Sequence, residues 1–436
     1  MAPVSFHSLI RILLFLCLFA PSTVWATTGA EISTLIEEAL QNNPELKAAK
    51  ARWEMTQQRP QSVAALDDPR LTLALNNLPV DSFRDDRSPM SGKTIKLSQA
   101  LPFPGKLGLK RSIAALQADW EERQYQEFSL QLVAQVRQES AELLFREASI
   151  DLFEKSLRLV DDLNRLVETR YAVGQGKQQD VLRAQLERSR LSEQLLTEKQ
   201  RRDTAKAALN TLLGRAATAP LVVIGDNAAD TKLPSRETLK AYAEAHRPLL
   251  KGYAALLDQS RQKLTLAKKD YWPDFTLGVA YTQREPAMTD PGTDFFSAEV
   301  GIVIPWQQKK REAVSEEAVA GLRMVQQEAE NSRTQILRDL EQSLLHLEQL
   351  TATRSLYRRA LIPQGEQAYQ AGLQAYRVGA GGYVSLIDAL LALNRDEIAL
   401  AQTERDLFQE QARLAATLGL EATESLSDVA TKENNR

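Results

Sequence analysis

Proline is absent from a very long stretch of this chain, the 115 positions of Gly105–Ala219. Glycine is nearly absent too, since only Gly174 and Gly176 lie well inside the stretch. Proline and glycine are the residues least compatible with a helix interior, so the stretch predicts very long helices. Residues 106–171, as one helix at about 1.5 Å per residue, would extend roughly 100 Å. That length exceeds the core of a compact domain, and it predicts helical hairpins that project from the rest of the molecule.

The sequence also repeats itself after roughly 204 positions. The segments "TLIEEALQNNPELK", "DPRLTLAL" and "YAVGQG" align with "TLKAYAEAHRPLLK", "WPDFTLGV" and "YRVGAGG" in one register. Local coincidence would not hold that register over such a distance. We therefore interpret the chain as a tandem duplication, with residues 27–233 as the first copy, 234–420 as the second and 421–436 as a polar C-terminal tail.

Each copy contains two segments in which apolar and polar residues alternate, which is the period of a strand with two different faces. We expect β-hairpins over about 69–101 and about 273–304, and long helical hairpins over about 106–214 and about 307–418. Strands of roughly ten residues are long enough to cross a membrane at a tilt.

Two prolines interrupt otherwise helical segments. We expect Pro60 to kink or break the helix that precedes the first strand, and Pro363 to bend the second helical hairpin locally.

The N-terminus has the plan of a secretory signal peptide covering residues 1–26. Arg11 lies near the front, residues 9–20 are apolar, and the small-residue exit "VWA" ends at Ala26. The apolar stretch is too short for a membrane anchor, which needs about 20 residues. Cys17, the only cysteine, lies inside it, and lipidation of Cys17 stays an alternative. The chain beyond Ala26 has no thiol, which excludes disulfides and thiolate metal sites there.

The composition argues against several classes of function. The 54 basic and 57 acidic residues nearly balance, so no nucleic-acid partner is expected. Beyond Ala26 the only histidines are His246 and His346, and no Ser/His/Asp or metal-ligand cluster is visible. We therefore expect no enzyme, no cofactor and no dedicated metal site.

Four strands cannot close a barrel alone, and a sheet facing lipid cannot keep an open edge, because its unpaired backbone groups would lie in hydrocarbon. Several chains should therefore contribute strands to one barrel. Three copies would give twelve strands, within the range of outer-membrane barrels. A periplasmic coiled-coil adaptor or scaffold is the alternative of another class, but it would have no need of lipid-facing hairpins.

The duplication, the strand pairs, the two "YxVG" turns, the "LIPQ" segment and the closing "LG" resemble the TolC family of outer-membrane efflux proteins. The resemblance covers essentially the whole chain after the signal peptide. It implies a mainly α fold with a β-barrel part: a homotrimer with a shared twelve-stranded barrel among the lipids of the outer membrane and a twelve-helix tunnel across the periplasm.

The resemblance also implies partners and cargo. The tunnel would dock to a periplasmic adaptor, a membrane fusion protein, and through it to an inner-membrane pump of the resistance-nodulation-division type. The stretch "LPFPGKLGLKR", residues 101–111, is most similar to members that serve cobalt-zinc-cadmium and related heavy-metal exporters. Heavy-metal cations are therefore the expected cargo of a passive duct, with drugs or type I secreted polypeptides as alternatives.

The glycine turns should each end one helix and start the next. By resemblance they should also form the adaptor-docking tip of the tunnel. The residues concerned are Val173, Gly174, Gly176, Val378, Gly379 and Gly381.

An aperture is implied beside the second turn. Asp388 matches an acid that rings the narrow opening in the family, although a solvated helix charge is the alternative. Ser385 occupies the family's other acidic position. Tyr376 matches a gating tyrosine, and Gly381 stands where some members carry its arginine partner. The second turn is therefore the expected gate, and the first a docking turn.

Four aromatic residues fall at the strand ends nearest the helices: Phe103, Tyr271, Trp272 and Trp306. We expect them to form an aromatic girdle at the membrane interface, with packing between barrel and tunnel as the alternative. The basic residues that follow, including Lys106 and Lys309, are expected to be solvated faces of helix starts.

Overall fold

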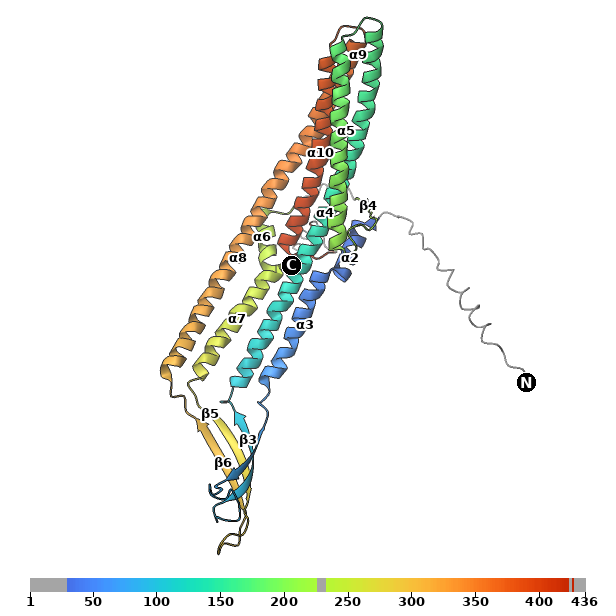
Figure 1. Ribbon diagram of the computed structural model, residues 1–436. Coiled ribbons are helices and arrows are strands. Elements are labelled where there is room, and N and C mark those ends of the chain that lie inside the picture. Colours follow the sequence, from blue (N-terminus) through green and yellow to red (C-terminus); the bar gives the residue numbers. More distant parts are fainter. Residues whose placement is uncertain (1–29, 226–232, 423–425, 427–436) are drawn as a thin grey trace, which may run out of the picture.

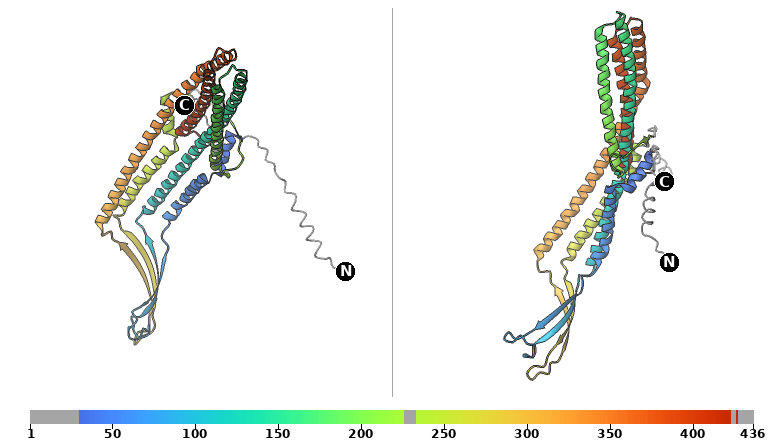
Figure 2. Two further views of the ribbon diagram at one scale, coloured as in Figure 1. Left: turned by 45° about the horizontal axis from the view of Figure 1, so that its top comes forward. Right: turned by 45° about the vertical axis from the view of Figure 1, so that its right-hand side comes forward.

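A computed structural model describes residues 30–225, 233–422 and 426. The expected signal peptide and most of the expected polar tail lie outside these described residues. The molecule is strongly elongated (Figure 1). A four-stranded sheet forms one end, long helices lying side by side form the middle, and a narrow helical bundle forms the other end. Figure 2 shows the same arrangement from two further directions.

The two halves of the chain contain matching helices and long strands in the same order, and the first half also has two short strands, β1 and β4, that pair with each other. The first half contains β1 (Ala30–Glu31), α2 (Ile32–Asn42), α3 (Pro44–Ala64), β2 (Arg70–Asn76), β3 (Gly92–Leu101), α4 (Lys106–Ala172), α5 (Gln178–Leu212) and β4 (Val223–Ile224). The second half contains α6 (Arg236–His246), α7 (Pro248–Lys269), β5 (Asp274–Gln283), β6 (Phe295–Val303), α8 (Gln308–Leu356), the π-helical turn η1 (Tyr357–Leu361), α9 (Ile362–Arg377) and α10 (Tyr383–Leu418).

The longest helices follow from the scarcity of proline. Helix α4 runs without a break for 67 residues. Its counterpart in the second half is divided into α8, η1 and α9, and Pro363 is the second residue of α9, which begins where the π-helical turn ends. Because proline has no N–H to donate, it disturbs the hydrogen-bond ladder there. Pro60 lies inside α3, which continues to Ala64, so the expected alternative of a break at Pro60 is wrong.

The sheet joins one hairpin from each half of the chain. Its strand order is β2-β3-β5-β6, and all its neighbours are antiparallel. The two hairpins meet where β3 pairs with β5, with Leu97 opposite Val279. Strands β2 and β6 are the edges, so in one chain each has a row of backbone groups without a strand partner.

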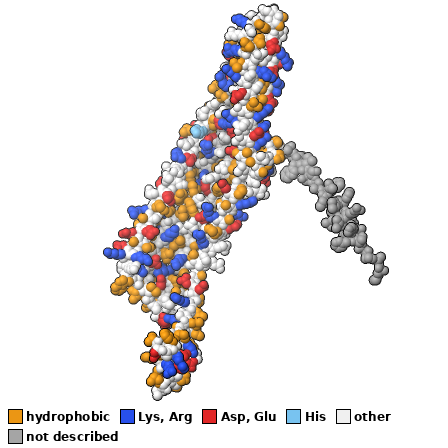
Figure 3. Space-filling model, in the orientation of Figure 1, with side chains coloured by type: hydrophobic (Ala, Val, Ile, Leu, Met, Phe, Trp, Pro, Cys, Tyr) orange, Lys and Arg blue, Asp and Glu red, His pale blue; other side chains and the backbone are white. Residues whose placement is uncertain are grey.

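The register sorts the side chains of this sheet into two different faces. One face is apolar and exposed: Leu73 is 72% and Val300 71% accessible. The exposed residues that share it include Leu71, Ile95, Leu97, Leu277, Val279, Tyr281, Phe296 and Ile302. The opposite face has mostly small or polar residues, with Thr94 bonded to Thr282 at 2.9 Å. Phe295 and Val303, at the two ends of β6, are the large apolar exceptions on this face. Figure 3 shows hydrophobic side chains at this end of the molecule, with charged ones gathered near the loops.

Four helices lie next to the sheet. Helix α4 packs between α3 and α7, and α7 packs against α8. Beyond them α4 continues into a bundle with α5, α9 and α10, where one of the apolar cores lies. Within the described part of the chain, no helix combines the length and apolar character that a membrane span requires.

A buried ion pair ties three helices together near the middle of the molecule. Arg247, at the start of α7, donates from Nε to Glu127 Oε2 of α4 at 3.0 Å, and its Nη2 pairs with the other carboxylate oxygen. The same guanidinium donates to the carbonyl oxygen of Ala416 near the end of α10. Glu127 is only 4% exposed, so its charge depends on Arg247 for compensation.

Candidate functional site

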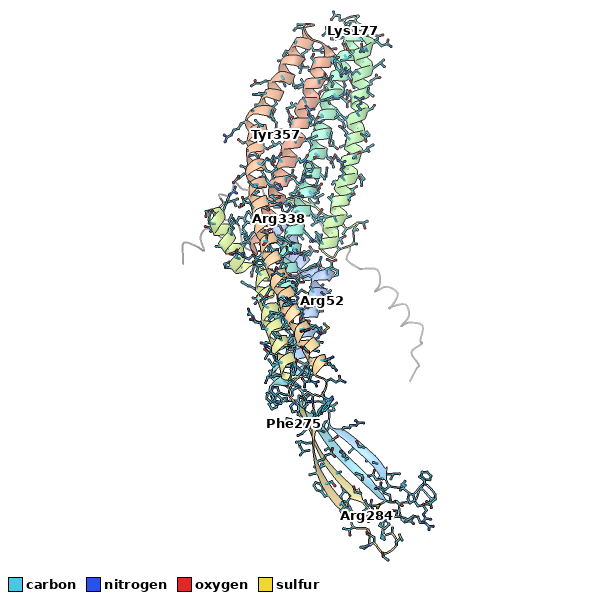
Figure 4. The ribbon with its side chains drawn as sticks, turned by 90° about the vertical axis from the view of Figure 1, so that its left-hand side faces the viewer. Arg52, Lys177, Phe275, Arg284, Arg338 and Tyr357 are labelled. Carbon is cyan, nitrogen blue, oxygen red and sulfur yellow. The ribbon has the colours of Figure 1, made fainter. Side chains whose placement is uncertain are left out.

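The two "VG" turns lie together at the end of the helical bundle, at the opposite end of the molecule from the sheet. Figure 4 labels Lys177, just after the first turn, at this end and Arg284, in a strand-connecting loop, at the other. Gly174 and Gly379 have positive φ angles of 74° and 78°, a conformation that side chains rarely adopt. Each turn is closed by a backbone N–H that bonds back to the helix, Gln175 to Arg170 in the first and Ala380 to Ala375 in the second.

Both turns present an apolar side chain to solvent. Val173 is 63% exposed and Val378 77% exposed. Gly176 faces the end of α4, because a Cβ there would lie 2.9 Å from the backbone nitrogen of Tyr171. Gly381 is similarly close to Ala375. The turns therefore form a tip with two exposed valines and little space for larger residues behind them.

The tyrosines of the two turns have different environments. Tyr171 of the first turn is 47% exposed, whereas Tyr376 of the second is 4% exposed. The ring of Tyr376 meets that of Tyr383 edge-on, with centroids 6.0 Å apart. Burial raises the pKa of Tyr376, with Asp180 adding to the shift and Arg170 opposing it. Its phenol therefore stays protonated at neutral pH.

Arg170 connects the two halves of the tip. Its guanidinium carbon lies 4.9 Å from the ring centroid of Tyr376, and its Nη1 donates to the carbonyl oxygen of that residue. The sequence resemblance implied an arginine partner for this tyrosine at the position of Gly381 in some family members, and in this chain Arg170 of α4 contacts the tyrosine. Arg170 was visible in the segment "ETRYAVG". Its partner could be identified only from the structure, in which α4 packs against α10 and Arg170 reaches Tyr376 near the end of α9.

Asp388 and Ser385 lie on the solvent side of α10, not beside the buried ring of Tyr376. The side chain of Asp388 is 59% exposed and pairs with Arg183 of α5 at 3.4 Å. Sequence reasoning missed Arg183 as well as Tyr383, whose hydroxyl is buried and has no hydrogen-bond partner among the described residues. Burial is the main cause that raises the pKa of Tyr383.

The four expected girdle aromatics lie where the strands meet the helices, the region marked by Phe275 in Figure 4. Phe103 stacks on Trp272 with centroids 5.2 Å apart. Trp272 is 57%, Trp306 86% and Tyr271 38% exposed. Trp272 and Trp306 therefore leave most of their surface uncovered in a single chain, whereas Tyr271 and Phe103 are mostly covered.

Lys106 corrects one expectation from the sequence, because it is buried and not solvated. Its Nζ lies 3.1 Å from Asp270 Oδ1 and 3.0 Å from Asp274 Oδ1. The same Asp274 oxygen accepts the backbone N–H of Phe103 at 2.6 Å. Lys106 thus links the start of α4 to the strand β5 of the other repeat, and two acids placed by that repeat explain its burial.

Replacing Lys106 should loosen this junction. In Lys106→Met the two carboxylates lose their cation, but both are 40–46% exposed and water can solvate them. We therefore expect a loss of about 1–2 kcal/mol, less than for a fully buried pair. Chemical denaturation of the purified protein would show a lower midpoint, while the exposed control Lys310→Met would unfold as wild type does. An unchanged midpoint for Lys106→Met would contradict a stabilising role for the pair.

No group of three or more His, Cys, Asp or Glu side chains within the described residues is arranged to hold a metal ion. The structure instead joins a four-stranded sheet with one exposed apolar face to a long helical bundle. Comparison with known proteins gives the family: a model described as "Outer membrane efflux protein" matches residues 35–215 and 241–420, and the chain belongs to this family. The TolC-family membership expected from the sequence is therefore confirmed.

Individual relatives are distant in sequence. The chain is 23% identical over 336 residues to the cobalt-zinc-cadmium resistance protein CzcC of Cupriavidus metallidurans, which covers 75% of each protein. The outer-membrane channel OprN has a TM-score of 0.78 at 17% identity, covering 90% of this chain and 91% of that one. The outer membrane protein VceC of Vibrio cholerae has a TM-score of 0.75 at 20% identity, covering 89% and 96%. These solved structures share the fold of this chain.

Proposed function

We propose that three copies of this chain form a passive duct, with the sheets closing into one twelve-stranded barrel in the outer membrane. The observation that carries the proposal is the exposed apolar face of the sheet together with its two open edges, β2 and β6. Apolar-out and polar-in alternation is the pattern of a membrane barrel, and closure removes unpaired edges from lipid. A periplasmic adaptor or scaffold has no use for such a face.

The same proposal orients the molecule. The helices form a tunnel across the periplasm, and the exposed girdle aromatics lie at the periplasmic interface of the membrane. The two turns with Val173 and Val378 then form the periplasmic end, where a membrane fusion protein docks and leads to a resistance-nodulation-division pump. Residues 1–26 are a removed signal peptide, 27–233 and 234–420 the two structural repeats, and 421–436 a polar tail.

Heavy-metal cations are the proposed cargo, with no catalysis and no bound cofactor. Two observations support this: the similarity to a cobalt-zinc-cadmium resistance protein, and the acid Asp388 beside the second turn. Three copies of Asp388 around an axis would favour cations. In one chain Arg183 neutralises it, so the aperture would gain its negative potential when that pair separates. Ser385 adds no charge, and Tyr376 acts by holding the turn.

Tolerance measurements test the cargo. A deletion strain should lose tolerance to zinc, cadmium or cobalt and recover it with the wild-type gene, while tolerance to antibiotics stays unchanged. Lost drug tolerance with unchanged metal tolerance would instead support a drug duct, and lost export of a polypeptide would support type I secretion.

Arg170→Ala should loosen the tip. The contact of Arg170 with Tyr376 joins α4 to the second turn, and a partly buried cation–π contact with a hydrogen bond stabilises the closed arrangement by about 1–2 kcal/mol. Since 1.4 kcal/mol is tenfold in an equilibrium, the open fraction should rise about tenfold. Single-channel recordings in planar bilayers would show it. The control Arg165→Ala removes an exposed arginine paired with Asp162 at 3.8 Å, and equal open fractions in the two variants would refute the role of Arg170.

A further inference from the structure

One ion pair crosses the polar face of the sheet. Lys96 of β3 and Glu299 of β6 approach to 2.5 Å between Nζ and Oε2, although the whole of β5 lies between their strands. Lys96 is opposite Ala280 and Glu299 is opposite Gly278. Both charged residues lie near the middle of their strands, so the pair lies at about half the height of the sheet.

Gly278 provides the space for this pair. A Cβ at position 278 would lie 3.4 Å from Cε of Lys96 and 3.6 Å from Cβ of Glu299. These are ordinary contact distances, so the side chains of Lys96 and Glu299 lie directly beside position 278. A larger side chain at 278 would occupy the path along which the lysine reaches the glutamate.

The neighbours on this face leave the pair electrostatically isolated. Towards the strand-connecting loops the nearest polar contacts are uncharged, with Asn76 bonded to Thr94 and Thr94 to Thr282. Beyond them, at the loop end, Arg284 is paired with Asp290. The other charged residues of the described sheet that share this face, Arg70 and Asp274, lie at the helix end. The middle of the face therefore contains one positive and one negative charge in direct contact.

We propose that the Lys96–Glu299 pair, held across Gly278, determines the ion preference of the barrel interior, because its positive and negative charges cancel each other halfway along the barrel. This rests on the proposed function, because the polar face lines water only if the sheets close into a barrel. Three copies then place three such pairs around the lumen. Loss of either partner would leave three like charges there, so the two partners have opposite effects on passing ions.

A cysteine at position 280 can report the local potential. Cys17 is the only native cysteine and lies in the expected signal peptide, so Ala280→Cys adds a single thiol to the mature chain. Intact cells would be treated with a cationic trimethylammonium or an anionic sulfonate methanethiosulfonate reagent, which enter from the outside and do not need an open tip. The rate of labelling would be measured for each reagent.

The expected changes have opposite signs. Combined with Lys96→Gln, the cationic reagent should react about threefold faster and the anionic one about threefold slower, as expected for one uncompensated nearby charge in water. Glu299→Gln should do the reverse. The double variant and the charge exchange Lys96→Glu with Glu299→Lys should return both rates to those of wild type. Lys93→Gln removes the same type of charge from the loop end of the other face, where it pairs with Asp85, and should change neither rate.

Val279→Cys distinguishes a failure of the proposed barrel from a failure of the proposed role of the ion pair. If the polar face lines a barrel, Ala280→Cys reacts and Val279→Cys, facing lipid, does not. Equal reactivity at both positions would overturn the proposed function. Reactivity at 280 alone, with the same ratio of cationic to anionic rates in Lys96→Gln, Glu299→Gln and wild type, would leave the barrel intact and overturn the role of the ion pair.

Discussion

Val279→Arg should abolish assembly of this protein in the outer membrane, whereas Ala280→Arg should not. Val279 is 44% exposed on the apolar face near the middle of β5, and its neighbour Ala280 belongs to the polar face. An arginine facing lipid at the membrane midplane costs about 2–4 kcal/mol, and a trimer repeats that cost in each copy. The cost summed over three copies is therefore about 6–12 kcal/mol. The stability of a folded protein is typically about 5–15 kcal/mol, so the cost is comparable to the whole stability.

The measurement is the amount of each variant in the outer-membrane fraction that migrates as a trimer on an unheated gel and as a monomer after heating. Ala280→Arg is the matched control, because it adds the same side chain one position along the same strand. Comparable trimer levels for both variants would show that the two faces of the sheet are not distinguished by lipid and water.

Arg247→Ala should destabilise the helical part of the protein by about 3–5 kcal/mol, the cost of leaving a buried charge without its partner. Glu127 is 4% exposed and receives two hydrogen bonds from Arg247. The alanine variant would also free the carbonyl oxygen of Ala416 on α10. The midpoint of unfolding of the purified protein, followed by circular dichroism, should fall clearly.

Two further variants separate charge from packing. Arg261→Ala, on the same helix α7, removes an arginine that is 62% exposed beside Asp258 and should cost less than about 0.5 kcal/mol. Adding Glu127→Gln to Arg247→Ala removes the uncompensated charge and should recover part of the loss. Equal unfolding midpoints for Arg247→Ala and Arg261→Ala would show that the buried Arg247–Glu127 pair does not stabilise the helical part of the protein.

The long-range plan of this molecule was predictable because it follows from local chemistry. Proline-free stretches predicted the unbroken α4, and period-two alternation predicted strands with one apolar face. The failures have local causes as well. Pro60 is accommodated in α3, whose last residue is Ala64. Lys106 looked like a solvated helix start, yet Asp270 and Asp274 arrive from the other repeat and enclose it.

At the tip, too, local features could be predicted from the sequence and contacts between distant segments could not. Glycine turns were visible in the sequence, since few other residues accept the conformation of Gly174 and Gly379. The partners of the expected gate residues were not, because Arg170 and Arg183 come from the other helical hairpin, about 200 positions away. Such pairs depend on how helices pack side by side, and one sequence does not specify that packing. The aperture and docking roles of the tip residues stay predictions.

The central claim is that three chains share one membrane barrel, and native mass spectrometry of the protein extracted by detergent from outer membranes tests it most directly. We expect a complex with the mass of three mature chains, released from the membrane only by detergent. A monomer with the mass of one mature chain, recovered from the periplasm without detergent, would contradict the shared barrel.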